Sequence, residues 1–254
     1  MIYPISDIND HLSNLGLVSS DTVMVHGDAG VAGQYIFKDA SNPLSSFIIN
    51  LLDYFNKGTV IVPSFTYSAT NNEIFEIDKT PSKTGDFSEM FRLIKGVHRS
   101  RHPIFSISCF GEYAQYYNDS LITDCFGKDT FFDKLYINNV KILTLGCSLD
   151  RVTFAHYVEQ KLNVSYRYFK YFKAHIKDEK TMKEITVRYF VRNLNLNTCL
   201  DLNNLESKSI QTEKLIKKPF GRLLARLISA DDFFNQASEL IKKNEYALIK
   251  ENKL

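Results

Sequence analysis

The sequence predicts an α/β fold, and two features of its N-terminal two thirds carry that prediction. Short apolar runs bounded by turn residues recur at residues 22–26, 59–63 and 141–146, and such runs are typical of buried strands. A segment with helical spacing of apolar residues lies between the first two runs, and another follows the third. Strands that alternate with helices build sheets that bind ligands at the carboxyl ends of the strands. We therefore expect the functional residues at that edge.

The composition is that of a soluble globular protein. The chain has 254 residues, 44% of them hydrophobic and 24% charged, which is enough to bury a sizeable core. A net charge of +2 gives no bulk electrostatic reason to bind nucleic acid. The four cysteines show no C-x-x-C spacing, which argues against zinc or disulfide frameworks and fits a reducing compartment.

The N-terminus and the hydropathy pattern predict a cytoplasmic protein. The first residues, Met1-Ile-Tyr-Pro-Ile-Ser-Asp, include no basic segment followed by a long apolar run, so we expect no signal peptide. No stretch approaches the ~18 consecutive apolar residues of a membrane-spanning helix. We expect no membrane partner, no nucleic-acid partner and no metal.

The first elements of the chain read as helix, strand, glycine-rich loop and helix. Residues 5–15 have amphipathic helical spacing that Gly16 ends. Residues 22–26 form the first strand, and three glycines follow it within residues 27–33. This loop has two interpretations: its backbone approaches a phosphate or pantetheine chain closely, or it is a flexible turn. The next helix starts at Pro43.

The second strand, residues 59–63, runs into a loop rich in hydroxyl groups at residues 64–68. If the two strands are parallel, their carboxyl ends share one edge of the sheet. Residues 71–83 are polar and irregular, and we expect a surface loop there. The polar side chains expected at the shared edge are those of His26, Asp28, Thr66 and Tyr67.

The middle of the chain contains its strongest basic cluster. Residues 85–96 predict a short helix with Asp86 or Ser88 as its cap. Residues 97–103 then bring together two arginines and two histidines, which either bind a phosphate-bearing ligand or form a solvated basic loop. Residues 104–110 alternate with period two and predict a half-buried strand.

Residues 141–159 predict a buried strand, a short loop and a helix that carries His156 and Glu159. The helix can be capped by Ser148, Asp150 or Thr153. His156 and Glu159 are three residues apart, which places them about 60° apart around a helix axis, so the carboxylate can reach the imidazole. A neutral imidazole beside a carboxylate is suited to general-base catalysis, and a helix N-terminus keeps the ring neutral.

Two other interpretations of this stretch stay open. A single histidine on an apolar helix is often a core or boundary residue whose polar atoms are satisfied. Cys147 near the helix start is a possible covalent nucleophile, although nothing in the sequence fixes a histidine beside it.

The last third of the chain predicts strands and a terminal helix. Residues 166–172 are strongly aromatic, which is more typical of a core strand than of a binding platform. Residues 184–192 form a clear strand that pairs with the preceding segment as a hairpin. Residues 193–209 are rich in asparagine and irregular, and residues 222–228 predict another strand. An aspartate at position 231 or 232 caps the C-terminal helix.

We predict one domain over residues 1–254. Its α/β core spans residues 1–163, and a β-rich segment with the terminal helix spans residues 164–254.

Several segments together resemble the antibiotic N-acetyltransferase family, whose best-known members are the aminoglycoside 3-N-acetyltransferases. The most specific pieces are R-S-x-H-P-x-x-S at residues 99–106 and T-F-x-H-x-x-E at residues 153–159. The resemblance covers most of the chain. Its segments are residues 23–26, 58–66, 96–106, 126–128, 145–159 and 221–240.

The resemblance implies an α/β domain with a central mixed sheet flanked by helices. It implies acetyl-CoA or another acyl-CoA as the donor and the amine of an aminocyclitol or amino sugar as the acceptor. His156 matches the family's catalytic base, and Glu159 matches the carboxylate that partners it. The residues that match the family's CoA-contacting regions are His26, Gly27, Asp28, Ala29, Thr66, Ser100, His102 and Ser106.

The sequence departs from the family after the first strand. The family usually has a Ser-Ser-Leu-like run there, whereas this chain has Gly-Asp-Ala-Gly at residues 27–30. Hydroxyl contacts to CoA are lost at these positions. A polycationic aminoglycoside needs a carboxylate-lined cleft, whereas a nucleotide-linked amino sugar needs aromatic and basic groups. The residues around Arg99, Arg101 and 166–172 favour the second acceptor.

We therefore predict a CoA-dependent N-acyltransferase that acts on a small-molecule amino sugar, either nucleotide-linked or an aminoglycoside antibiotic. Backbone amides at residues 27–30 or the Thr66 hydroxyl are the expected oxyanion donors. The alternative is a non-catalytic binding protein that has kept the fold. A role in antibiotic resistance, a role in cell-surface sugar synthesis, and a homodimer all stay open.

Overall fold

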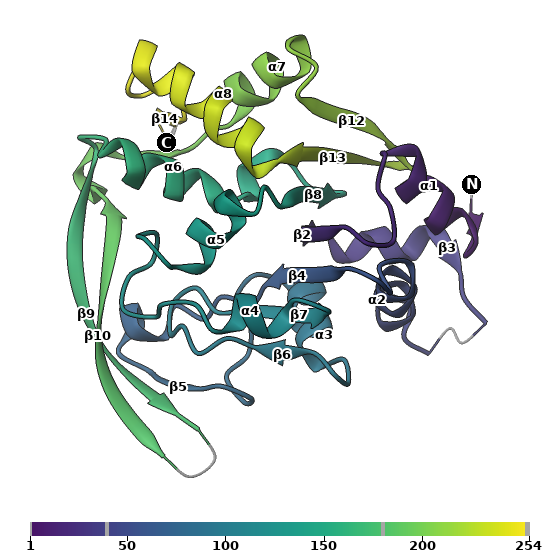
Figure 1. Cartoon of the computed structure of the whole chain (residues 1–254), viewed down its shortest axis with the longest axis horizontal. Helices are drawn as coiled ribbons and strands as arrows, with labels where there is room; N and C mark the ends of the chain where they lie inside the picture. The colour runs from purple at the N-terminus through teal and green to yellow at the C-terminus, as the bar shows by residue number, and fades with distance from the viewer. Residues whose placement is uncertain (1, 39–40, 179–180, 252–254) are drawn as a thin grey trace.

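A computed structural model describes residues 2–38, 41–178 and 181–251, and a seven-stranded mixed sheet lies at its centre (Figure 1). The strand order is β12-β13-β8-β2-β4-β7-β6. β2 runs parallel to both β4 and β8, whereas the outer strands are antiparallel to their neighbours. The bounds are β2 Thr22–Gly27, β4 Thr59–Pro63, β6 His98–Arg99, β7 Ile107–Gly111, β8 Lys141–Leu145, β12 Leu215–Phe220 and β13 Leu223–Ser229. The predicted mixed sheet is confirmed; Met1 and residues 252–254 lie outside the described residues.

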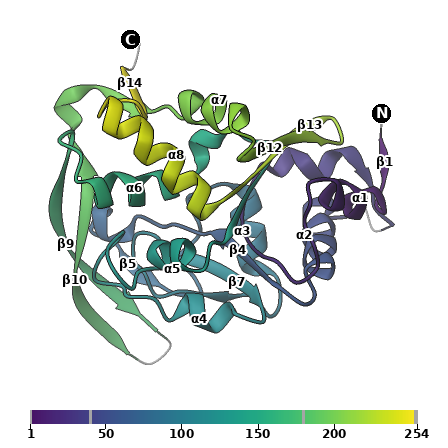
Figure 2. The ribbon, with the colours of Figure 1, turned by 45° about the horizontal axis from the view of Figure 1, so that its top comes forward.

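Helices cover both faces of this sheet (Figure 2). One face packs on α1 Asp7–Asn14, α2 Pro43–Tyr54 and α3 Asp86–Leu93. The other packs on α4 Ala114–Asn118, α5 Phe131–Ile137, α6 Phe154–Leu162, α7 Asn203–Gln211 and α8 Ala230–Lys243. In the described part of the chain, no helix combines the length and the apolar character needed to cross a membrane.

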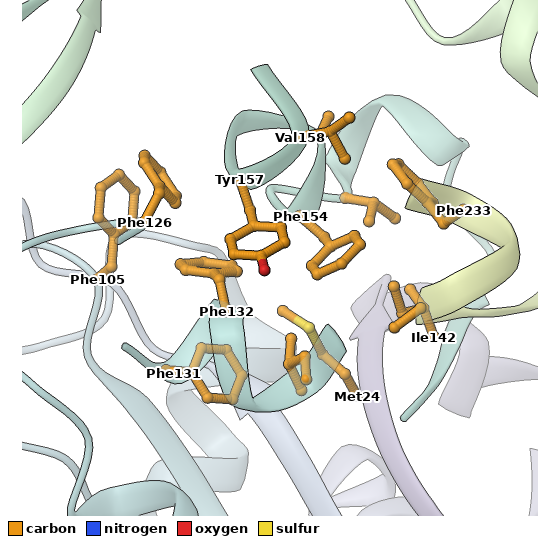
Figure 3. Close-up of a cluster of buried hydrophobic side chains, with 14 of the residues drawn as sticks. Met24, Phe105, Phe126, Phe131, Phe132, Ile142, Phe154, Tyr157, Val158 and Phe233 are labelled. Atoms are coloured by element: carbon orange, nitrogen blue, oxygen red, sulfur yellow. The ribbon is translucent and has the colours of Figure 1, made fainter. Parts of the chain in front are cut away.

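Side chains alternate between the two faces along the central strands, which decides where the polar residues point. Val23 and Val25 of β2 pack with the first group of helices. Met24 packs with Phe154 of α6 on the opposite face (Figure 3). Because successive strand residues point to opposite faces, His26 is on the same face as Met24, toward α6.

A long hairpin lies at the margin of the molecule (Figure 1). It consists of β9 Arg167–Lys177 and β10 Met182–Arg192, and β5 Ile74–Glu76 pairs with β9. The predicted hairpin is confirmed, but the prediction of an aromatic core strand is wrong. Tyr168, Phe169 and Tyr171 are 49%, 39% and 64% exposed, because this marginal sheet presents much of its surface to solvent.

Other differences from the sequence prediction are local. Residues 193–209, predicted irregular, include β11 Thr198–Leu200 and the start of α7. The C-terminal helix is capped by Ser229, whose hydroxyl accepts from the amide of Asp232. α3 has Gly85 as its N-cap, and β7 is buried rather than half-buried because it lies between β4 and β6.

The remaining elements are β1 Tyr3–Pro4, β3 Tyr35–Ile36, β14 Ile249–Glu251 and the 3₁₀ turns η1 Ala29–Gln34, η2 Ser68–Asn71, η3 Leu149–Arg151 and η4 Leu194–Leu196.

Candidate active site

The end of β8 and the start of α6 place His156 and Glu159. Gly146 follows β8 with a φ of 74°, a left-handed conformation that favours glycine, and the chain then passes through η3 into α6. Phe154 and Tyr157 of α6 point into the aromatic core below the helix (Figure 3). The predicted side-chain cap is absent, because Thr153 occupies the N-cap position without a capping hydrogen bond.

His156 and Glu159 are in direct contact. The distance between His156 Nδ1 and Glu159 Oε2 is 2.6 Å. The Glu159 side chain is fully buried, whereas His156 keeps 18% of its side chain exposed. When Nδ1 carries the proton and donates to Glu159, Nε2 is left with its lone pair to accept a proton. The contact expected from the spacing of three residues is therefore present.

Two residues at the start of the hairpin complete this cluster, and the sequence analysis did not assign either to the site. Tyr166 Oη donates to Glu159 Oε1 at 2.8 Å. Arg167 places Nε 2.7 Å from Glu159 Oε2 and Nη2 2.8 Å from His156 Nδ1. Both residues follow α6 across a turn, so no helical periodicity connects them to His156 and no local signal in the sequence reveals the contact.

The electrostatics of the cluster favour a carboxylate beside a neutral imidazole. Burial pushes the pKa of Glu159 upward, but His156, Arg167 and Tyr166 together outweigh it and hold that pKa below its usual value. Burial, and then the charge of Arg167, lower the pKa of His156 against the opposing pull of Glu159. The imidazole is thus kept neutral mainly by burial and a guanidinium, where the sequence suggested a helix N-terminus.

A cavity of about 700 Å³ opens at the carboxyl ends of the central strands. Thr153, one turn before His156, lies on its wall, while His156 itself lies farther along α6. The walls of the cavity are formed by His26, Gly27, Asp28, Ala29, Pro63, Phe65, Tyr67, residues 83–88, Cys147, Asp150, Arg151 and Thr153. The position is the one that parallel strands in an α/β sheet favour for a ligand.

The end of β2 and the loop that follows it line this cavity at all four predicted positions, His26 to Ala29. His26 Nε2 is buried and has no hydrogen-bond partner among the described residues, and burial lowers the pKa of His26 to about 4. A Cβ atom on Gly27 would come within 2.5 Å of the Phe87 ring, so only glycine fits there without a shift. The loop thus presents a neutral imidazole with an unused nitrogen.

The other four residues predicted to contact CoA do not line the cavity. They are buried and bonded to backbone groups that fix the loop before β7. Thr66 Oγ1 donates to Pro103 O, Ser100 Oγ accepts from Ile107 N, His102 Nδ1 accepts from Phe105 N, and Ser106 Oγ donates to Ser64 O. The Thr66 hydroxyl is therefore already engaged as a donor.

The two arginines of the basic cluster at residues 97–103 are engaged within the protein. Arg99 donates to the carbonyl oxygens of Ser64 and Ile77 at 2.6 and 3.1 Å. Arg101 forms an exposed ion pair with Asp178. Arg99 thus holds backbone segments together, and neither arginine lines the cavity.

The sequence analysis missed the segment from Lys83 to Ser88, which it divided between a surface loop and a helix. This segment forms one wall of the cavity. Thr84 Oγ1 donates to Pro63 O at 2.8 Å, which ties the segment to the end of β4. The one signal for this segment in the sequence was Gly85. In the structure Gly85 has a φ of 105° and forms a turn that brings the start of α3 to the sheet edge. Among the described residues, no group of three or more histidine, cysteine or acidic side chains is arranged to hold a metal.

Comparison with known proteins gives one family and one fold. A sequence model of the family described as aminoglycoside 3-N-acetyltransferase matches residues 24–242. No curated protein matches the sequence.

Three solved structures are similar over nearly the whole chain. The aminoglycoside acetyltransferase AAC(3)-Xa is 20% identical, covers 94% of this chain and 93% of its own, and superposes with a TM-score of 0.80. The YokD protein from Bacillus subtilis is 19% identical, with coverages of 96% and 95% and a TM-score of 0.80. AAC-IIIb in a binary complex with CoASH is 18% identical, with coverages of 96% and 97% and a TM-score of 0.79. These similarities establish the fold.

Proposed function

Because the chain belongs to the aminoglycoside 3-N-acetyltransferase family, we propose that it transfers an acetyl group from acetyl-CoA to a primary amine of an amino sugar, with His156 as the general base. The observation that carries this proposal is the contact between His156 Nδ1 and the buried Glu159 carboxylate, 2.6 Å, one helical turn from the cavity wall. The chain acts as one acyltransferase domain: residues 1–163 supply His26 and His156, and residues 164–254 supply Arg167.

The cavity at the strand ends suits the pantetheine arm and acyl group of acetyl-CoA. Its volume is about 700 Å³, and the buried Nε2 of His26 lacks a partner that a ligand amide or carbonyl would provide. Lys83 and Arg151 add positive charge to its walls, and Asp28, Asp86 and Asp150 add carboxylates. The AAC-IIIb structure with the same fold contains CoASH. When bound, acetyl-CoA supplies a thioester whose carbonyl carbon accepts an amine and whose thiol leaves.

The loop after β2 also offers a donor for negative charge on the thioester oxygen. The amide of Asp28 already donates to Leu145 O, and the amide of Gly30 donates to the Asp28 carboxylate. Ala29 begins η1, and the first amides of a helix have no partner within it. We propose the Ala29 N–H as the oxyanion donor, in place of the hydroxyl groups that the family usually has on this loop.

In the proposed reaction, His156 Nε2 takes a proton from the acceptor amine as its nitrogen bonds to the acetyl carbon. The carbon–sulfur bond breaks, and the proton returns to the departing thiolate directly or through water. Glu159 holds Nδ1–H and stabilises the imidazolium that forms. The chemistry thus requires no covalent enzyme intermediate.

Cys147 lines the cavity, but its setting opposes a covalent route. Burial raises the pKa of Cys147 to about 11, and its Sγ lies 3.3 Å from the His26 carbonyl oxygen, to which it donates. A thiol in this state is a poor nucleophile. We expect Cys147→Ser to keep turnover within about threefold of the wild type. A stable acetyl group on Cys147 in quenched reactions, together with an inactive Cys147→Ser, would contradict this expectation.

The charges near the dyad give a reason to consider a nucleotide-linked amino sugar beside an aminoglycoside. Arg167 and Arg192, which pair across the open end of the hairpin, both lower the pKa of His156. Arg188 stacks its guanidinium over Phe169, 4.6 Å from the ring centroid. Cations next to exposed aromatic rings suit a base and phosphates better than a polycation.

Ligand-induced thermal stabilisation tests the donor and the acceptor separately. We expect acetyl-CoA to raise the melting temperature, because a ligand that binds only the native state stabilises it. Aminoglycosides and nucleotide-linked amino sugars would then be added as two panels to the acetyl-CoA complex, and the panel that stabilises it further identifies the acceptor class. Stabilisation by an amino sugar without any stabilisation by CoA or acetyl-CoA would instead support a non-catalytic binding protein.

A further inference from the structure

We propose that Arg167 is a positioning residue that keeps Glu159 ionised and leaves His156 available as a neutral base. The inference rests on the proposed function and deepens it by naming what controls the charge state of the dyad. Arg167 lies at the first position of β9, outside α6 and outside the T-F-x-H-x-x-E segment.

The geometry places one guanidinium against both His156 and Glu159. Arg167 Nε lies 2.7 Å from Glu159 Oε2, and Nη2 lies 2.8 Å from His156 Nδ1. Nη1 donates to the backbone oxygen of Phe190 at 3.2 Å, which anchors the side chain to β10. The Arg167 side chain is only 6% exposed, so its charge is poorly screened by solvent.

A buried carboxylate alone would work against a neutral base. Glu159 has no solvent contact, so without a cation it would either take up a proton or hold His156 as the imidazolium. An imidazolium cannot accept a proton from the amine. Arg167 supplies the balancing charge, so the pair can remain a carboxylate beside a neutral ring. Arg167 also keeps Glu159 ionised, so the carboxylate can accept a hydrogen bond from Nδ1–H.

Nδ1 can satisfy only one of its two neighbours at a time. It either donates its proton to Glu159 or accepts one from Arg167 Nη2, and base catalysis at Nε2 needs the first arrangement. Arg167 Nε lies 2.7 Å from Glu159 Oε2 as an ion pair but forms no hydrogen bond there, so Oε2 stays available to accept the hydrogen bond from Nδ1–H, which favours the first arrangement. A lysine at position 167 would keep the charge but could not reach three groups as a planar fork does.

The other titratable and charged groups near His156 do not supply the positive charge that balances Glu159. Tyr166 donates to the second oxygen of Glu159 and is uncharged. Tyr189 of β10 is also neutral, since burial raises its pKa. Arg192, at the end of β10, is exposed and donates to Thr198 O. On the loop that carries Phe126, Asp124 is already paired with Arg188.

The test is the pH dependence of kcat/KM, which reports the free enzyme, together with an NMR titration of the His156 imidazole. In Arg167→Met, we expect the acidic limb of the profile and the NMR midpoint to move to higher pH. Activity at a fixed pH on that limb falls about tenfold for each unit of displacement. Arg167→Lys should keep the limb near its wild-type position while kcat falls, because charge is kept and geometry is lost.

Arg92→Met provides a matched control, because Arg92 is also a largely buried arginine paired with a glutamate, but in α3. It should lower the melting temperature without moving the limb or the NMR midpoint. An unmoved limb and midpoint in Arg167→Met, or an equal movement in Arg92→Met, would overturn the inference. If Arg167→Met does not fold, Arg167→Gln takes its place with the same expectation.

The two readouts separate this inference from the proposed function. If the wild type acetylates no acceptor, the proposed function fails. The NMR midpoint of His156 then still decides the role of Arg167, because it needs no turnover: displacement in Arg167→Met supports the inference, and an unchanged midpoint refutes it.

Discussion

His156→Ala is expected to reduce kcat by about 10²–10⁴-fold, the contribution of a positioned general base. This factor corresponds to roughly 3–5 kcal/mol of transition-state stabilisation. The loss should fall on kcat, because His156 lies beyond the residues that form the cavity wall. Acetyl-CoA should therefore stabilise the variant against heat about as well as it stabilises the wild type. The measurement is steady-state thiol release together with the melting temperature at several concentrations of acetyl-CoA.

His98→Ala is the control for this variant. His98 is exposed on β6, far along the sheet from β8, and its removal should leave kcat and KM unchanged. A His156→Ala enzyme that kept the wild-type rate at every pH would remove His156 from the mechanism. A variant that lost acetyl-CoA binding as well would show that His156 contacts the donor.

Acid is expected to destabilise the fold strongly between pH 6.5 and 4, because His26 and His102, in addition to His156, are buried in neutral form. Burial lowers the pKa of both His26 and His102 from 6.5 to about 4. The unfolded chain then binds more protons than the native chain throughout this window, so the free energy of unfolding falls as the pH falls. Each histidine contributes about 3 kcal/mol, since one pKa unit is worth 1.36 kcal/mol. Above pH 6.5 this contribution is constant.

Urea unfolding at half-unit pH intervals measures this dependence. His102→Asn removes one titrating ring and leaves an oxygen that can accept from the amide of Phe105, which donates to His102 Nδ1 in the native protein. The variant should lose about 3 kcal/mol of the pH dependence across the window. A free energy of unfolding that is equal at pH 4.5 and pH 7 in the wild type would show that the two rings are not buried as neutral groups.

The sequence predicted the parts of the site that depend on short-range periodicity. His156 and Glu159 lie on one helix, so a period of 3.6 residues was enough to place the carboxylate against the imidazole. His26 and its loop were found in a similar way, because parallel strands bring their carboxyl ends to one edge. Both predictions use regular geometry that residue spacing encodes.

The remaining parts of the site depend on tertiary packing. Tyr166 and Arg167 reach Glu159 only because the chain turns back after α6 and starts the hairpin there. Ser100 and Ser106 match positions in the family's CoA-contacting regions. In the structure, however, both hydroxyl groups are buried and bond to backbone groups. The aromatic run of β9 is exposed because its strand joins a marginal sheet instead of the central one. Residue type and spacing contain none of this information.

The most direct test of the account is thiol release from acetyl-CoA by the wild-type protein with an amino-sugar acceptor, followed by the mass of that acceptor. The account predicts that each acceptor molecule gains one acetyl group on its amine, in step with the thiol released. It also predicts that His156→Ala loses this product while Cys147→Ser keeps it. Thiol release without an acetylated amine, or an acetylated product formed equally well by His156→Ala, would contradict the proposed role of the His156–Glu159 pair.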